Sequence, residues 1–148
     1  MRVEKDFKEF IALLHKNSVR YLIVGGFAFA FHAEPRFTKD IDIFLDTAPE
    51  NVAGVMKSLA EFGFGASGLK PDDFSEPNQI IQLGVPPVRI DLLTSISGLE
   101  FGTAWENRVM GNYGDVPAIF ISKADLIANK KATGRKQDLS DIDRLYKI

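Results

Sequence analysis

The sequence predicts an α+β fold in which a mixed β-sheet is flanked by helices. Two observations lead to this fold class: helix-like and strand-like apolar patterns alternate in the first half of the chain, and several short apolar runs then precede two helical segments. The chain has 148 residues, of which 45% are hydrophobic and 26% charged. This size and composition are typical of one globular domain, which we expect to span residues 1–148.

The first half of the chain predicts helices and strands in alternation. Apolar residues at spacings of three, one and three mark the first helix, and a short apolar run ended by glycines marks the first strand. A later proline stands where a helix begins. The expected elements are a helix over 6–16, a strand over 21–24, a helix over 27–32, a strand over 40–45 and a helix over 49–62.

The second half predicts mainly short strands, followed by two helices. Ser122 is expected to cap the first of these helices and Gly134 to end it. Leu139, Ile142 and Tyr146 are expected to face inward from the last helix. The expected elements are a loop over 63–77, strands over 80–83 and 88–93 joined through Gly84 and Pro86-Pro87, strands over 105–110 and 116–121, and helices over 123–132 and 137–146.

Composition excludes several classes of protein. The net charge of −2 gives no broad basic surface for wrapping nucleic acid, although a short RNA end or a nucleotide needs only a local patch. The chain has no Cys, which excludes disulfides and thiolate metal sites. It shows neither a signal peptide nor an apolar run long enough for a membrane span. We therefore expect a cytoplasmic protein with no membrane partner.

Three aspartates are the candidate catalytic and metal-binding residues. Asp40 and Asp42 alternate with isoleucines on a predicted strand, so both carboxylates point to one face and need a cation such as Mg²⁺ or Mn²⁺ to offset their repulsion. A bare Asp-x-Asp is more often a solvated strand face or an aspartate that caps a turn. Asp91 adds a third carboxylate within another apolar strand. Its alternative role is a salt bridge, for instance with Arg89 or Arg36.

Gly25 and Gly26 lie between a predicted strand and a predicted helix, upstream of the first two aspartates. Backbone N–H groups at a helix N-terminus bind anions, and glycine lets a phosphate approach the main chain closely. The pair is therefore a candidate nucleotide-binding turn. By itself, a Gly-Gly turn usually supplies only a tight bend.

Basic and hydroxyl side chains near these motifs are further candidates for nucleotide binding. Arg36 and Thr38 come just before the aspartates and are expected to reach phosphate oxygens. Lys130, with Arg135 and Lys136 near the Gly134 turn, is expected to form a basic spot for phosphate or an RNA end. The alternative is that these are surface residues on a turn and a solvated helix.

Together these motifs resemble the DNA polymerase β-type nucleotidyltransferase superfamily, and most closely its AbiEii-like minimal nucleotidyltransferases. The resemblance rests on a Gly-Gly pair opening a helix, an Arg-x-Thr-x-Asp-Ile-Asp stretch, a later single acid, and the C-terminal helices. It spans about residues 22–145. The matching segments are residues 22–28, 36–42, 90–92 and 123–145.

The resemblance implies a nucleotidyltransferase-like mixed sheet and assigns a role to each motif. Asp40 and Asp42 would hold two metal ions, and Asp91 would complete the site and assist deprotonation of the acceptor. Gly25 and Gly26 would cradle the triphosphate. Superfamily members often carry Gly-Ser where this chain has Gly-Gly, so a hydroxyl contact to phosphate would be replaced here by backbone donors.

The implied function is a Mg²⁺-dependent transfer of an NMP group from an NTP, such as ATP, to an RNA, protein or small-molecule acceptor. AbiEii-like relatives act as toxins paired with antitoxins, so a toxin role is a further implication. One alternative is a catalytically silent nucleotide-binding or partner-binding protein of the same fold. Another is a subunit whose acceptor site is completed by another chain. An antitoxin and a second copy in a homo-oligomer are the candidate protein partners.

Overall fold

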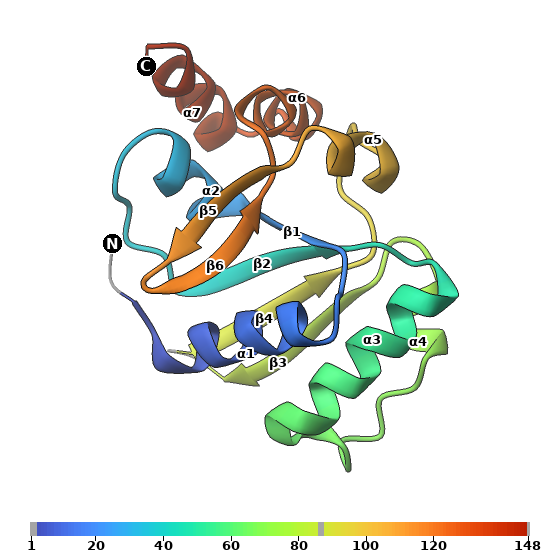
Figure 1. The fold of residues 1–148 in the computed structure, drawn as a ribbon. Helices are drawn as coiled ribbons and strands as arrows, with labels where there is room; N and C mark the ends of the chain where they lie inside the picture. The colour runs from blue at the N-terminus through green and yellow to red at the C-terminus, as the bar shows by residue number, and fades with distance from the viewer. Residues whose placement is uncertain (1–2, 86–87, 148) are drawn as a thin grey trace.

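The computed structural model describes residues 3–85 and 88–147, which form one six-stranded sheet with helices packed against it (Figure 1). The predicted α+β fold, a mixed sheet flanked by helices, is confirmed. The turn predicted at Pro86-Pro87 lies outside the described residues. The elements are α1 (Lys5–Lys16), β1 (Tyr21–Val24), α2 (Gly25–His32), β2 (Asp40–Leu45), α3 (Pro49–Leu59), the π-helical turn η1 (Ala60–Phe64), α4 (Asp72–Ser75), β3 (Ile80–Val85), β4 (Val88–Leu93), α5 (Phe101–Glu106), β5 (Val109–Tyr113), β6 (Val116–Phe120), α6 (Lys123–Thr133) and α7 (Lys136–Tyr146).

The sheet has the strand order β3-β4-β2-β1-β6-β5. Strand β2 runs parallel to β4, and β1 runs parallel to β6, whereas the other neighbours are antiparallel. The parallel pairing of β2 with β4 needs a long crossover, which α3, η1 and α4 supply together with the hairpin strand β3. This crossover places β2 and β4 side by side in the sheet, although about forty residues separate them in sequence.

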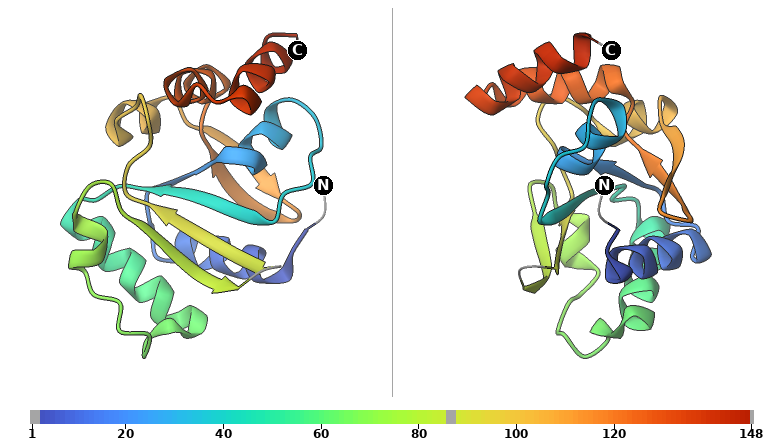
Figure 2. Two further views of the ribbon diagram at one scale, coloured as in Figure 1. Left: turned by 180° about the vertical axis from the view of Figure 1, so that it is seen from behind. Right: turned by 90° about the vertical axis from the view of Figure 1, so that its left-hand side faces the viewer.

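Helices α1 and α3 lie on one side of the sheet, and α6 and α7 lie on the other side (Figures 1 and 2). The apolar stripe of α1, namely Phe7, Phe10, Ile11 and Leu14, is at most 1% exposed, as its helical spacing predicts. Helix α2 contacts β1, β2 and both C-terminal helices. Among the described residues, none of the helices has the length and apolar character that crossing a membrane requires.

The segment predicted as a strand over 105–110 is partly wrong. Its first two residues end helix α5, and strand β5 begins only at Val109. Phe101, Ala104 and Trp105 follow helical spacing, and Ala104 is fully buried while Phe101 stacks on Trp105. This packing favours a helical turn over an extended chain. The predicted loop over 63–77 likewise contains helix α4, which buries Phe74.

The predicted inward face of the last helix is also partly wrong. Ile142 is buried as expected, but Leu139 and Tyr146 are 54% and 60% exposed. Asp138 and Asp141 are buried instead. The inward face of α7 is thus partly ionic, and its partners come from elsewhere in the fold.

Candidate active site

Two of the predicted aspartates project from the same face of strand β2. Ile41 and Ile43 point to the opposite face and are fully buried, whereas Asp40 and Asp42 remain partly accessible. Asp91 on β4 is the direct Cα partner of Asp42, so its carboxyl lies on this same face. The fold therefore brings all three predicted carboxylates together at two adjacent strands. We call Asp40, Asp42 and Asp91 the acid cluster.

Arg89 lies within the acid cluster. It precedes Asp91 by two residues on β4 and pairs in register with Asp40 on β2. Its Nη2 donates to Asp40 Oδ2 at 2.6 Å, and its Nε and Nη2 donate to the two oxygens of Asp91 at 3.1 and 3.2 Å. The salt bridge considered for Asp91 therefore exists, with Arg89 rather than Arg36. The two-residue period of a strand was the signal that placed this arginine beside the acids.

Asp42 is the member of the acid cluster without a salt bridge among the described residues. Burial, followed by the charges of Asp91 and Asp40, raises the pKa of Asp42 to about 7, and a hydrogen bond with Asp91 adds to this effect. The charge of Arg89 opposes the increase. The acid cluster therefore holds more negative charge than its single arginine offsets.

The glycine pair opens helix α2 directly beside Asp42. Val24, which precedes the helix, pairs with Asp42 across the sheet and provides no side-chain cap, and the first turn contains no acidic residue. The N-terminal backbone N–H groups of α2 are therefore suited to an anionic ligand. Thr38 lies over Gly26, where a Cβ would be 2.8 Å from the Thr38 methyl carbon. The predicted residues Gly25, Gly26 and Thr38 thus adjoin the acid cluster.

Gly25→Ala is expected to destabilise the domain more than Gly134→Ala. Both glycines have a φ of +64°, which costs a residue with a Cβ about 1–2 kcal/mol. A Cβ at Gly25 would also lie 2.3 Å from Asp42 Oδ2, whereas the nearest atom at Gly134 is 3.6 Å away. The difference between the two variants in free energy of unfolding, measured with urea, reports this contact. Equal losses would contradict the close approach of Gly25 to Asp42.

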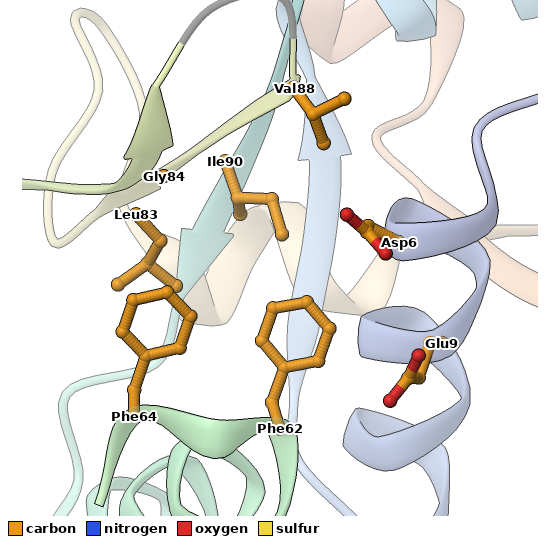
Figure 3. Close-up of a pocket in the computed structure, with 8 residues that line it drawn as sticks. All are labelled: Asp6, Glu9, Phe62, Phe64, Leu83, Gly84, Val88 and Ile90. Carbon is orange, nitrogen blue, oxygen red and sulfur yellow. The ribbon is translucent and has the colours of Figure 1, made fainter. Parts of the chain in front are cut away.

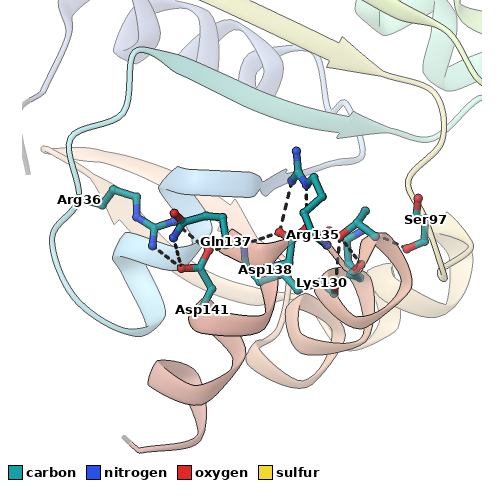
Figure 4. Close-up of polar contacts among 9 residues, drawn as sticks. Arg36, Ser97, Lys130, Arg135, Gln137, Asp138 and Asp141 are labelled. Atoms are coloured by element: carbon teal, nitrogen blue, oxygen red, sulfur yellow. Dashed lines mark hydrogen bonds and ion pairs between the residues drawn. The ribbon is translucent and has the colours of Figure 1, made fainter.

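Arg36 and Lys130 lie in a buried ion network that joins α6 and α7 to the loop before β2 (Figure 4). Arg36 donates to both oxygens of Asp141, with one bond of 2.9 Å, and its guanidinium stacks 3.8 Å from the Phe29 ring centroid. Lys130 Nζ, in a residue only 6% exposed, donates to Asp141 Oδ2 at 2.8 Å. The structure therefore places both cations in a structural pairing, and it does not bring them together with the acid cluster.

Arg135 is the exposed cation of this region. Its Nε donates to Asp138 Oδ2 at 2.7 Å, while 75% of its side chain remains exposed. Hydrogen bonds from Arg135 to Asp138 raise the arginine's pKa, and the charges of Asp141 and Asp42 add to this effect. Figure 4 shows Arg135 extending from the start of α7 toward strand β2. Of the predicted basic spot, Arg135 rather than Lys130 thus faces the acid cluster.

The donor chemistry of the acid cluster fits a divalent cation. Its three carboxylates supply the hard oxygen ligands that Mg²⁺ and Mn²⁺ prefer, and Asp42 lacks a salt-bridge partner in the described residues. With Arg89 bound to two of them, however, the three carboxylates are not positioned to ligate one common metal ion. Across residues 3–85 and 88–147, no trio of acidic or histidine side chains is so positioned. The ligand set is therefore present but not arranged as a closed metal site.

A hollow of about 250 Å³ lies on the other face of the sheet (Figure 3). Val88 and Ile90 line it, and these residues alternate with Arg89 and Asp91 along β4. Its remaining lining residues come from α1, η1 and β3: Asp6, Glu9, Phe62, Phe64, Leu83 and Gly84. Because the sheet separates this hollow from the acid cluster, a ligand there would not reach the carboxylates.

Comparison with known proteins identifies the family. The family model described as a nucleotidyltransferase of unknown function (DUF6036) matches residues 1–146. The chain therefore belongs to this nucleotidyltransferase family. No curated protein matches the chain.

Solved structures share this fold. A lincomycin-bound lincosamide antibiotic adenylyltransferase, LnuA, matches with a TM-score of 0.56 and 18% identity, over 97% of this chain and 96% of that one. An antigenic nucleotidyltransferase-like protein from Paracoccidioides brasiliensis matches with a TM-score of 0.55 and 15% identity, over 97% of this chain and 77% of that one. At these identities the likeness establishes the fold, which is that of nucleotidyltransferases.

Proposed function

We propose that this protein is a divalent-metal-dependent nucleotidyltransferase that moves an NMP group from an NTP to an acceptor. One observation carries the proposal: Asp42 and Asp91 are register partners on parallel strands, directly beside the uncapped N-terminus of helix α2. Carboxylates for a cation and N–H groups for phosphate thus occupy one place. Membership of a nucleotidyltransferase family supports the same chemistry.

In this proposal Asp40, Asp42 and Asp91 would hold Mg²⁺ or Mn²⁺. Such ions, when bound, would stabilise the attacking and leaving oxygens of an in-line displacement. The acceptor oxygen would bond to the α-phosphorus as the bond to the pyrophosphate oxygen breaks, and we assign to Asp91 the role of taking the acceptor's proton. The protein contributes mainly position and charge.

The triphosphate is proposed to bind at the N-terminus of α2, over Gly25 and Gly26, with Thr38 beside them. Arg135 is a basic side chain that is highly exposed and close enough to Asp42 to be affected by its charge. We assign to Arg135 the phosphate contact that the sequence suggested for Lys130. Arg36 and Lys130 instead support the site by anchoring the C-terminal helices through Asp141.

The acceptor is proposed to approach over the edge strand β3. Gln82 pairs with Asp91, and Ile80 pairs with Leu93, so these side chains share the face of the acid cluster. Both are exposed, Ile80 to 64%, which leaves this side of the site open. RNA, protein and small-molecule acceptors all fit an open side. A small molecule gains support from LnuA, a lincosamide adenylyltransferase by its name.

The AbiEii-like subgroup, a toxin role with a cognate antitoxin, a homo-oligomeric site and a cytoplasmic location are finer parts of the same proposal. The subgroup and the toxin role rest on the sequence resemblance described above, the cytoplasmic location rests on the sequence composition, and the homo-oligomeric site is the alternative in which another chain completes the acceptor site. Copurification with a chain encoded beside this one, together with growth arrest on expression alone, would test the toxin role.

The proposed function predicts transfer of label from an α-³²P-labelled NTP that depends on a divalent cation. Each of the four NTPs, including ATP, is incubated with Mg²⁺ or Mn²⁺ and with an RNA pool, the protein itself or small hydroxyl compounds that include lincomycin. Transfer should vanish in EDTA and in Asp91→Asn, and it should persist in Asp72→Asn, an exposed carboxylate on α4. NTP binding by calorimetry without transfer to any acceptor would favour the catalytically silent alternative.

A further inference from the structure

Arg89 lies between Asp40 and Asp91, at the position where a metal ion bound by both carboxylates would lie. Its guanidinium uses both oxygens of Asp91 and one oxygen of Asp40, through three hydrogen bonds of 2.6–3.2 Å. These bonds reach across two neighbouring strands that are both interior to the sheet. The backbone register, rather than a flexible loop, therefore fixes the position of the arginine among the acids.

The charge of the acid cluster favours a resident cation. Three carboxylates on adjacent strands repel one another, and neither strand can move away because each is paired on both sides. The side chains of Arg89 and Asp40 are 27% and 29% exposed, and that of Asp91 is 10% exposed, so water screens this repulsion only in part. In the metal-free chain, Arg89 supplies the positive charge that keeps the cluster together.

A guanidinium and a divalent cation compete for the same carboxylate lone pairs. A carboxylate bound bidentately by arginine has fewer free positions for a metal, and the two cations repel each other at short range. A guanidinium is also an effective phosphate ligand once it is released. Binding of the metal and of the NTP should therefore be linked through this one side chain.

We infer that Arg89 is a built-in counter-cation that metal must displace from Asp40 and Asp91, and that the released guanidinium then binds a phosphate oxygen of the NTP. This inference rests on the proposed function. It makes Arg89 a substrate-binding residue that weakens binding of metal alone and strengthens binding of metal together with nucleotide. Affinities that are linked in this way change reciprocally.

The test is Mn²⁺ binding, followed by electron paramagnetic resonance of the free ion, with and without a non-hydrolysable NTP. Arg89→Gln should bind Mn²⁺ alone about tenfold more tightly than the wild type, and the gain in Mn²⁺ affinity caused by the nucleotide should shrink by a similar factor. Arg89→Lys should fall between the two. Arg108→Gln, which alters an exposed arginine stacked on Trp105, should match the wild type.

Thermal unfolding provides a second measurement that does not depend on turnover. Arg89→Gln should unfold at a lower temperature than the wild type in EDTA and should gain more from Mn²⁺. If that variant does not fold in EDTA, it is refolded with Mn²⁺, and Arg89→Lys carries the affinity comparison. Equal Mn²⁺ affinities in folded wild type and variants would overturn the role of Arg89 alone. Absence of Mn²⁺ binding in all of them would overturn the proposed metal site and this inference with it.

Discussion

Asp42→Asn is expected to lower the rate of nucleotidyl transfer by about 10²- to 10³-fold or more. The substitution keeps the size of the side chain but removes the carboxylate nearest to Gly25 and opposite Asp91. An amide oxygen can still ligate a divalent cation, but it lacks the negative charge that offsets the charge of the ion. Initial rates of transfer from a labelled NTP measure the effect, and Asp72→Asn serves as the charge-matched control.

The same substitution should stabilise the metal-free fold. Because the pKa of Asp42 is raised to about 7, from its ordinary value of 3.8, ionisation of this group opposes folding. The wild type should therefore lose stability in EDTA as the pH rises from about 4 to about 7, by a few kcal/mol at most, and Asp42→Asn should lack this loss. Urea unfolding at several pH values distinguishes this result from simple misfolding. A variant that is inactive and also less stable at pH 8 would contradict the assignment.

Asp141→Ala is expected to cost about 3–5 kcal/mol of stability, the largest loss that we expect from a single substitution in this protein. Asp141 is fully buried and accepts hydrogen bonds from Arg36, Lys130 and Gln137. Its removal leaves the buried amino group of Lys130 without its closest partner. Urea unfolding measures the loss. Asp143→Ala, an exposed position on the same helix, should change stability by no more than about 0.5 kcal/mol.

The buried network should also make the protein sensitive to acid. Burial alone would raise the pKa of Asp138, but hydrogen bonds from Arg135 and Thr133 outweigh it and hold that pKa at about 2. Burial would likewise raise the pKa of Asp141. Hydrogen bonds from Arg36, Lys130 and Gln137 outweigh this effect and lower the pKa. The stabilisation is therefore present above the ordinary aspartate pKa of 3.8 and is lost as the pH falls toward 2. Acid unfolding of Asp141→Ala should be shallower than that of the wild type, and identical slopes would argue against this role.

The local pattern of the sequence was sufficient for most of the fold. The alternation of aspartate and isoleucine around Ile41 predicted a strand with both acids on one face, and that geometry is present. Helix α6 begins after Ser122 and ends before Gly134, as expected. The Ser122 hydroxyl accepts from the N–H of Asp125, and Gly134 adopts the left-handed conformation. These features depend on neighbours within a few residues, which the sequence alone specifies.

Features that depend on distant partners were not predicted. The spacing of α7 pointed to Leu139 as an inward residue, but a buried carboxylate at Asp141 is stable only because Arg36, more than a hundred residues earlier, pairs with it. Asp141 is also the partner of Lys130, and the pattern of helix α6, which carries Lys130, gives no sign of this partner on α7. The sequence did offer Arg89 as one of two salt-bridge partners for Asp91, whereas the bond from Arg89 to Asp40 depends on the β2–β4 register.

The exposure of strand β3 beside the acid cluster affects how much NTP the proposed reaction would lose to hydrolysis. No described element covers Gln82, and Ile80 remains largely in contact with solvent, so the reacting phosphate would not be sealed from water. Water would then compete with the intended acceptor, since enzymes suppress such wasteful hydrolysis by enclosing their substrates. Fidelity in this protein would therefore depend on how completely a well-fitting acceptor itself covers the open side.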